Sequence, residues 1–165
     1  MEQPFAKRGA RADEALELMK VLWTGEVVEH HGEFYDVPRL QLAPATPGPI
    51  PIVVGGLSEA ALKRAARHDG WMSDFATIDE LGEFRRRIEE HREALGRTDV
   101  PFALYGSPKD AMTADDFARA EAVGVTDIVT MPWAYYHGFT DDLDQKVEGL
   151  ERFAAEVMSQ IPDPA

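Results

Sequence analysis

The stretch PIVVGGLSEAALKRA, residues 51–65, places an apolar run, two glycines and an amphipathic segment one after another. Residues 50–54, IPIVV, are continuously apolar, as expected for a strand that is buried on both faces. Ser58 stands where the N-cap of a helix would lie, and Ala61 and Leu62 fall on the inner side of that helix. The stretch therefore predicts a strand, a glycine turn and a helix.

The same pattern of strand and helix repeats three times toward the C-terminus. Further strands are expected at residues 71–75, 101–106 and 125–131, each followed by residues with helical spacing. The helices are expected to begin at Thr77, Thr113 and Thr140, the first with a capping box closed by Glu80. The order βαβαβαβα over residues 50–165 predicts an α/β protein with a parallel sheet and right-handed crossovers. Two architectures share this order, an open doubly wound sheet and a (β/α) barrel.

The N-terminal part of the chain differs from this pattern. Residues 1–24 are expected to contain a leading helix, because apolar residues recur there at spacings of three and four and Gly25 follows. Residues 25–49 show no long periodicity and are interpreted as a long surface loop, with a small hairpin around His31 and Gly32. A loop of this length in a compact domain is usually functional or mobile. The whole chain, residues 1–165, is interpreted as a single domain.

The composition excludes several classes of function. A formal net charge of −13, with no basic stripe, argues against nucleic acid or an anionic membrane as a partner. The absence of cysteine excludes disulfides and thiolate metal sites, and it fits a reducing cytoplasm. The N-terminus lacks the apolar core of a signal peptide, and no apolar run approaches the ~20 residues of a membrane span. We therefore expect a cytoplasmic protein.

Four βα units make up half of an eight-unit barrel, which typically takes about 250 residues. A lone sheet of four parallel strands leaves two edges unpaired, and unpaired edges tend to associate. The simplest partner for such a half-barrel is a second copy related by a two-fold axis. On this reasoning, we expect a homodimer.

Two segments resemble a known family. PFAKRGARADEALELMKVLWTGEVVEHHGEFYDV, residues 4–37, and PIPIVVGGLSEAALKRAARHDGW, residues 49–71, are similar to the luciferase-like monooxygenases, which include flavin-dependent and coenzyme F-420-dependent oxidoreductases. The family fold is a TIM barrel. The resemblance implies that IPIVVGG is its fifth strand and that the next three strands are the sixth to eighth. The family's strands one to four have no counterpart in this sequence.

The resemblance implies a cofactor site at the glycine turn. Relatives bind the phosphate of FMN or of F-420 on this loop, so Gly55, Gly56, Leu57 and Ser58 are expected to hold a phosphate. Glycine allows close approach of the backbone, and a helix N-terminus favours an anion. A plain βα turn with Ser58 as an ordinary N-cap is the alternative. Trp71 is placed near the cofactor ring by the resemblance, and a core tryptophan is the equal alternative.

Other residues that could carry chemistry have simpler explanations. His30, His31 and His68 lack convincing metal-ligand spacing, so we expect a solvated loop pair and an exposed histidine at a helix end. Asp74 ends a predicted strand and fits a turn or helix-capping role better than that of a general base. An aromatic cluster on the loop after the last strand fits either a ring ligand or an interface; it comprises Trp133, Tyr135, Tyr136 and His137. No metal site and no catalytic residue is predicted.

The resemblance thus implies an oxidoreductase that uses F-420 or FMN on a small organic substrate, with F-420 favoured. A non-catalytic half-barrel that forms homodimers and binds at most a phosphate is the alternative. A flavodoxin-like open domain that binds FMN is a third possibility, and it would need helices on both faces of its sheet.

Overall fold

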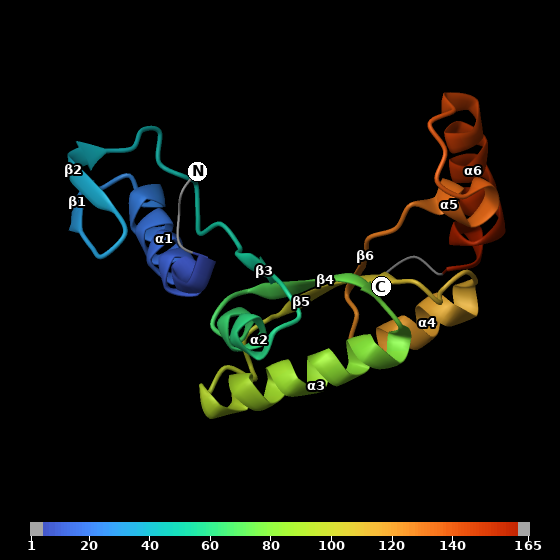
Figure 1. Cartoon of the computed structure of the whole chain (residues 1–165), viewed down its shortest axis with the longest axis horizontal. Coiled ribbons are helices and arrows are strands. Elements are labelled where there is room, and N and C mark those ends of the chain that lie inside the picture. The colour runs from blue at the N-terminus through green and yellow to red at the C-terminus, as the bar shows by residue number, and fades with distance from the viewer. Residues whose placement is uncertain (1–4, 162–165) are drawn as a thin grey trace.

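The structure is a computed structural model that describes residues 5–161 (Figure 1). Its main sheet has four parallel strands in the order β3-β4-β5-β6, with a separate antiparallel hairpin, β1-β2. The strands are β1 (Val27–His31), β2 (Asp36–Gln41), β3 (Val53–Gly55), β4 (Gly70–Ala76), β5 (Ala103–Pro108) and β6 (Asp127–Ile128). The helices are α1 (Arg8–Trp23), α2 (Glu59–Ala65), α3 (Ile78–Ala94), α4 (Ala114–Ala122), α5 (Pro132–His137) and α6 (Leu143–Glu156), with 3₁₀ turns η1 (Phe5–Lys7) and η2 (Met158–Gln160).

The two faces of the main sheet differ in what covers them. Val54, Trp71 and Leu104 lie in one row across β3, β4 and β5, and all three are buried in the core against the helices. Side chains alternate along a strand, so neighbouring residues point the other way. On that side Val53 is 37% exposed and Met72 is 41% exposed. The helices therefore cover one face of the sheet and leave the other open.

This one-sided cover decides between the two architectures. A doubly wound domain has helices on both faces of its sheet, whereas a (β/α) barrel keeps its helices outside. The sheet is thus of the barrel type, as expected, and the flavodoxin-like possibility is excluded. The expectation that residues 50–54 form a strand buried on both faces is wrong in part: β3 begins at Val53, and Ile50 and Pro51 before it are exposed. Val53 is exposed because nothing in the described chain covers the inner face of the sheet.

Local sequence signals account for the helices that follow the strands. Ser58 Oγ accepts a hydrogen bond from the N–H of Ala61 and caps α2, and Thr77 and Glu80 form the predicted capping box of α3. Thr113 caps α4, also as predicted. The last helix begins later than predicted, because the Asp142 side chain caps α6.

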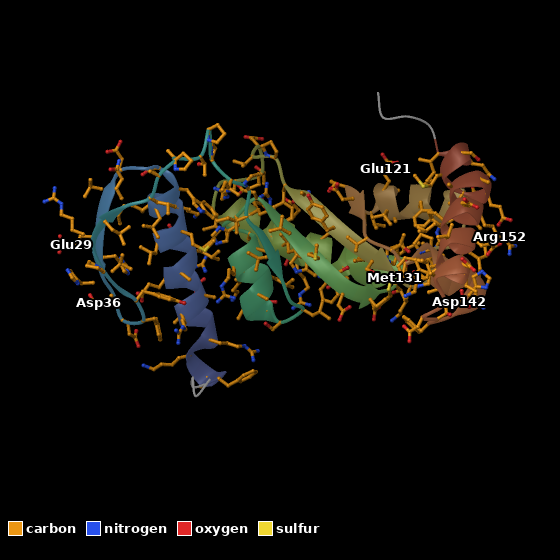
Figure 2. All side chains as sticks on the ribbon, turned by 90° about the horizontal axis from the view of Figure 1, so that it is seen from above. Glu29, Asp36, Glu121, Met131, Asp142 and Arg152 are labelled. Atoms are coloured by element: carbon orange, nitrogen blue, oxygen red, sulfur yellow. The ribbon has the colours of Figure 1, made fainter. Side chains whose placement is uncertain are left out.

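The C-terminal helices form a layer of their own at one end of the molecule (Figure 1). Residues 132–137, which were expected to be a loop, form the short helix α5. α6 packs onto it through Phe153, whose ring stacks on Tyr135 at 5.9 Å and meets Phe117 of α4 edge-on at 5.8 Å. Met131 lies at the junction between the sheet and this layer (Figure 2).

The hairpin and α1 lie at the opposite end (Figures 1 and 2). The predicted hairpin around Gly32 is present, and Glu14 of α1 accepts hydrogen bonds from the N–H groups of Phe34 and Tyr35. Arg64 of α2 binds Asp13 at 2.6 Å and joins α1 to the rest of the fold. None of the helices between residues 5 and 161 combines the length and the hydropathy that a membrane-spanning helix needs.

Candidate functional site

The carboxyl ends of all four main strands meet at one edge of the sheet. In (β/α) barrels the loops at this edge build the active site, because consecutive loops converge there. The loops after β4, β5 and β6 lie close together, since the Lys109 N–H bonds to the Ala76 carbonyl and Lys109 and Met131 line one cleft. The glycine turn follows β3 at the same edge. This edge is therefore the candidate functional site.

The two glycines of the turn after β3 differ in what surrounds them. Gly56 has φ +114°, and a Cβ there would lie 3.0 Å from Ala61 Cβ, so a larger residue would be strained and crowded. A Cβ on Gly55 would meet only the carbonyl oxygen of Met72, at 3.9 Å. Space for a close ligand is thus open at Gly55, while Gly56 shapes the turn.

Ser58 links the turn to α2. Its Oγ accepts from the N–H of Ala61 at 3.3 Å, which leaves the hydroxyl proton available to a ligand. Leu57, between the glycines and Ser58, is 44% exposed. The first N–H groups of a helix have no partner within the helix. In α2 the N–H of Ala61 is bound by Ser58, which leaves those of Glu59 and Ala60 for a ligand. α2 has only seven residues, so individual N–H groups matter more here than a helix dipole.

Trp71 is placed in the core, with its indole directed at the turn. The side chain is fully buried, and its ring packs against Phe84 of α3 at 5.3 Å. Its Nε1–H donates a 2.9 Å hydrogen bond to the carbonyl oxygen of Gly56. In the described structure Trp71 therefore supports the loop from beneath and presents no exposed ring face.

The histidines are not brought together. His30 bonds to Glu14 at 3.0 Å, and His31 bonds to Asp36 at 2.5 Å, both at the hairpin. The expectation that His68 is exposed is wrong: it is 4% exposed, because α1 covers it. Burial, followed by the nearby charge of Lys20, lowers the pKa of His68 below its ordinary value. Among residues 5–161, no cluster of three or more His, Asp and Glu side chains is placed to hold a metal ion.

Asp74 lies at the candidate edge but caps no helix. Its carboxylate accepts a hydrogen bond from the N–H of the adjacent Phe75 at 2.8 Å. The N–H of Ile78, at the start of α3, is instead bound by Asp110 from the next loop. Asp74 lies within β4, where the register with β5 is irregular between Met72 and Phe75, so the turn or helix-capping role that was expected is wrong.

The structure adds a cleft that sequence reasoning did not find. It measures about 100 Å³ and lies between the ends of β4, β5 and β6. Its lining includes Phe75, Ser107, Thr130 and Tyr135. Of the aromatic cluster after the last strand, only Tyr135 lines this cleft. Because side chains alternate along a strand, the sequence of β5 could have indicated that Ser107 shares a face with Tyr105. No local sequence pattern indicates that Thr130 and Tyr135 are in contact.

The rest of the aromatic cluster belongs to the helical layer. Tyr136 donates to Glu156 of α6 at 3.3 Å, and its ring lies under the guanidinium of Arg152. His137 bonds to Glu148, also on α6. These contacts fit a structural role in joining α5 to α6.

A larger cavity of about 590 Å³ lies on the open face at the opposite edge of the sheet. Its lining includes Ile50, Val53, Pro101 and Tyr105, close to the amino ends of the strands. In barrels this end serves stability rather than chemistry. The cavity is therefore interpreted as an uncovered part of the barrel interior.

A one-sided parallel sheet with its loops gathered at the carboxyl edge defines a protein of the (β/α)-barrel class. Residues 1–161 match the family model of the luciferase-like monooxygenases, and the chain belongs to that family. The resemblance of the two quoted segments is thereby confirmed.

Individual relatives agree with this assignment. An uncharacterised protein of Mycobacterium tuberculosis is 43% identical over 98% of this chain and 56% of its own length. An F420-dependent hydroxymycolic acid dehydrogenase of the same organism is 31% identical over 73% of this chain and 36% of its own length. This chain thus spans about half the length, 56%, of the first of these relatives.

A solved structure gives the same fold. The coenzyme F420-dependent tetrahydromethanopterin reductase of Methanopyrus kandleri superimposes with a TM-score of 0.71 over 93% of this chain and 64% of the reductase. The sequence identity is 14%, so this likeness shows the fold alone. The expected fold class is confirmed.

Proposed function

We propose that the chain is part of an oxidoreductase that uses coenzyme F420, with FMN as the second candidate, on a small organic substrate. The glycine turn at the carboxyl end of β3 is the observation that carries this proposal. The space beside Gly55 is open, and the left-handed Gly56, where a Cβ would lie 3.0 Å from Ala61 Cβ, turns the backbone toward α2. Relatives whose names include F420 favour that cofactor over FMN.

The residues of the turn fit the phosphate that both cofactors carry. The backbone of Gly55, Gly56 and Leu57 would approach the phosphate, and the Ser58 hydroxyl would donate a hydrogen bond to it. Trp71 would keep the turn in shape through its bond to the Gly56 carbonyl. When bound, the deazaflavin would supply hydride transfer, and FMN would supply electron transfer or oxygen activation. The protein would hold and orient the cofactor and exclude water.

The proposal is tested by titrating the chain with F420 and with FMN and following fluorescence. Saturable binding of one of them is expected, with a loss of at least about tenfold in affinity for Gly56→Ala. Gly96→Ala is the matched control, because Gly96 also has a positive φ (+63°) but has no neighbour within 4 Å of its Cβ. Equal binding by the Gly56 variant and the unchanged chain would refute the phosphate site.

A second candidate function has an observation in its favour. Val53, Met72 and Ile128 leave apolar surface on the inner face and the β6 edge of the sheet, between 37% and 41% exposed. A homodimer that covers this face, with at most a phosphate at the turn and no turnover, would explain that exposure. A dimeric chain that binds neither F420 nor FMN would support this second candidate.

A further inference from the structure

The cleft between the ends of β4, β5 and β6 has aromatic walls. Phe75 at the end of β4 is 53% exposed and Phe139, beyond α5, is 83% exposed, and both line the cleft. Exposed aromatic rings in the lining of a cleft offer apolar and π surface to a flat ligand. The volume of about 100 Å³ is well above the ~10–15 Å³ that a cavity needs to hold one water molecule.

A pair of hydroxyl groups supplies the polar character of the cleft. Thr130 Oγ1 and Tyr135 OH lie 2.6 Å apart and share one hydrogen bond. In such a pair one hydroxyl donates its proton, and the other keeps its own proton free for a ligand. Ser107, which also lines the cleft, adds a third hydroxyl. The cleft thus offers a hydrogen-bond donor and hydrogen-bond acceptors to one oxygen-containing group of a ligand.

The charges around the cleft favour a neutral ligand. Lys109 contributes a cation to the lining, and its Nζ lies 3.3 Å from Glu80 Oε2. The Thr77 N–H and Lys109 together hold the pKa of Glu80 below its ordinary value, so this carboxylate stays charged and balances the lysine.

We infer that this cleft binds a small neutral ring compound with one hydroxyl or carbonyl oxygen. The ring would lie between Phe75 and Phe139, and the oxygen would bind the Thr130–Tyr135 pair. A closed apolar cavity of about 150 Å³ in another protein holds benzene, so an open cleft of about 100 Å³ accommodates such a ring with part of it outside. The inference rests on the proposed function in one respect. It takes the cleft as the place where the substrate binds, at the same carboxyl edge of the sheet where the cofactor would bind.

The position of the cleft fits that role. The glycine turn follows β3 and the hydroxyl pair follows β6, so the two are separated by three strand spacings, each of about 4.8 Å. A cofactor whose phosphate lies at the turn would therefore extend across the carboxyl edge toward the cleft. Its reactive ring and a ligand in the cleft would then be neighbours.

The test uses phenol as the probe and toluene as the analogue without oxygen. The chain, labelled with ¹⁵N and free of cofactor, is titrated with each and followed by amide chemical shifts. Saturable phenol binding is expected, with the largest shifts at the amides of Ser107, Lys109, Thr130, Met131, Ala134 and Tyr135. Tyr135→Phe and Thr130→Val should each weaken phenol binding about tenfold, or 1.4 kcal/mol, and leave toluene binding unchanged. Because Tyr135→Phe keeps the ring that stacks on Phe153, the fold should persist.

Tyr105→Phe is the matched control, since Tyr105 lines the larger cavity at the other edge of the sheet. It should bind phenol as the unchanged chain does. The inference is overturned by shifts that centre on Tyr105, by non-saturable binding, or by equal losses of phenol and toluene in both hydroxyl variants. Cofactor binding without phenol binding would refute the cleft alone, and phenol binding without cofactor binding would refute the proposed cofactor alone.

Discussion

The buried indole of Trp71 donates a 2.9 Å hydrogen bond to the carbonyl oxygen of Gly56, and so ties the core to the turn of the candidate cofactor site. The bond joins a residue on β4 to the loop after the neighbouring strand β3. Because Gly56 is left-handed, its carbonyl is not held by a regular sheet or helix pattern. Trp71 is held in the core by its packing against Phe84, and its hydrogen bond to Gly56 in turn fixes the position of the loop.

Replacing Trp71 by Phe should weaken cofactor binding more than it harms the fold. The ring would still pack on Phe84, while the donor to Gly56 would be lost at a cost of about 1 kcal/mol. We expect at most about fivefold weaker FMN or F420 binding, and faster amide hydrogen exchange at residues 56–58. Trp133→Phe, on α5, should leave both measurements unchanged. Unchanged exchange at the turn in Trp71→Phe would contradict a role in positioning the loop.

Two substitutions at Ser58 separate helix capping from phosphate binding. Asp and Asn are both good N-cap residues, so Ser58→Asp and Ser58→Asn should preserve α2 and the thermal unfolding midpoint. The added carboxylate would repel a phosphate, whereas the amide would not. Cofactor titration should therefore show binding abolished by Asp and only reduced by Asn. Similar affinities for the two variants would show that no phosphate lies near Ser58.

A charge on the open face of the sheet should prevent self-association. Met72 lies in the register row of Gly55, Tyr105 and Asp127 and is 41% exposed. If a second copy covers this face, Met72→Lys would bury an unpaired charge, and light scattering should show twice the chain mass for the unchanged protein and the single mass for the variant. Leu95→Lys, at the end of α3, is the control. A monomeric unchanged chain at high concentration would exclude the homodimer.

Stability should depend on pH through His68. Burial, reinforced by Lys20 and opposed by Glu17, lowers the pKa of this imidazole in the folded chain below its ordinary value of 6.5. The unfolded chain then binds the proton more readily, so the stabilisation is present above about pH 6.5 and is lost as the pH falls below it. Urea unfolding of the unchanged chain and of His68→Gln should give curves that converge between about pH 7 and 5. Parallel curves would show that His68 does not titrate differently on folding.

Gly149 should resist replacement by alanine even though it lies inside a helix. Alanine normally favours a helix interior over glycine by about 1 kcal/mol. Here a Cβ would lie 2.5 Å from Trp133 Cα, so α5 and α6 would have to separate. We expect Gly149→Ala to lower the thermal unfolding midpoint. Gly82→Ala on α3, where the Cβ would meet only the side chain of Val123 at 3.3 Å, should have little effect, and a raised midpoint for Gly149→Ala would contradict the close packing.

Features that depend on neighbouring residues could be predicted from the sequence. The capping box of Thr77 and Glu80 and the N-cap at Ser58 follow from residues three apart in the chain. The helix α5 was missed, because an aromatic run after a strand resembles a loop and its stability comes from packing on α6. The burial of His68 was missed because α1, which covers it, precedes it by more than forty residues.

The succession of βα units, the glycine turn and the caps followed from the sequence alone, because periodicity and turn chemistry act over a few residues. The tertiary structure decided which face of the sheet the helices cover, which carbonyl Trp71 binds, and that Phe75 shares a cleft with Tyr135. These relationships join residues from different βα units. Periodicity reports which side chains avoid water, but only the packing of complete elements determines which distant side chains they meet.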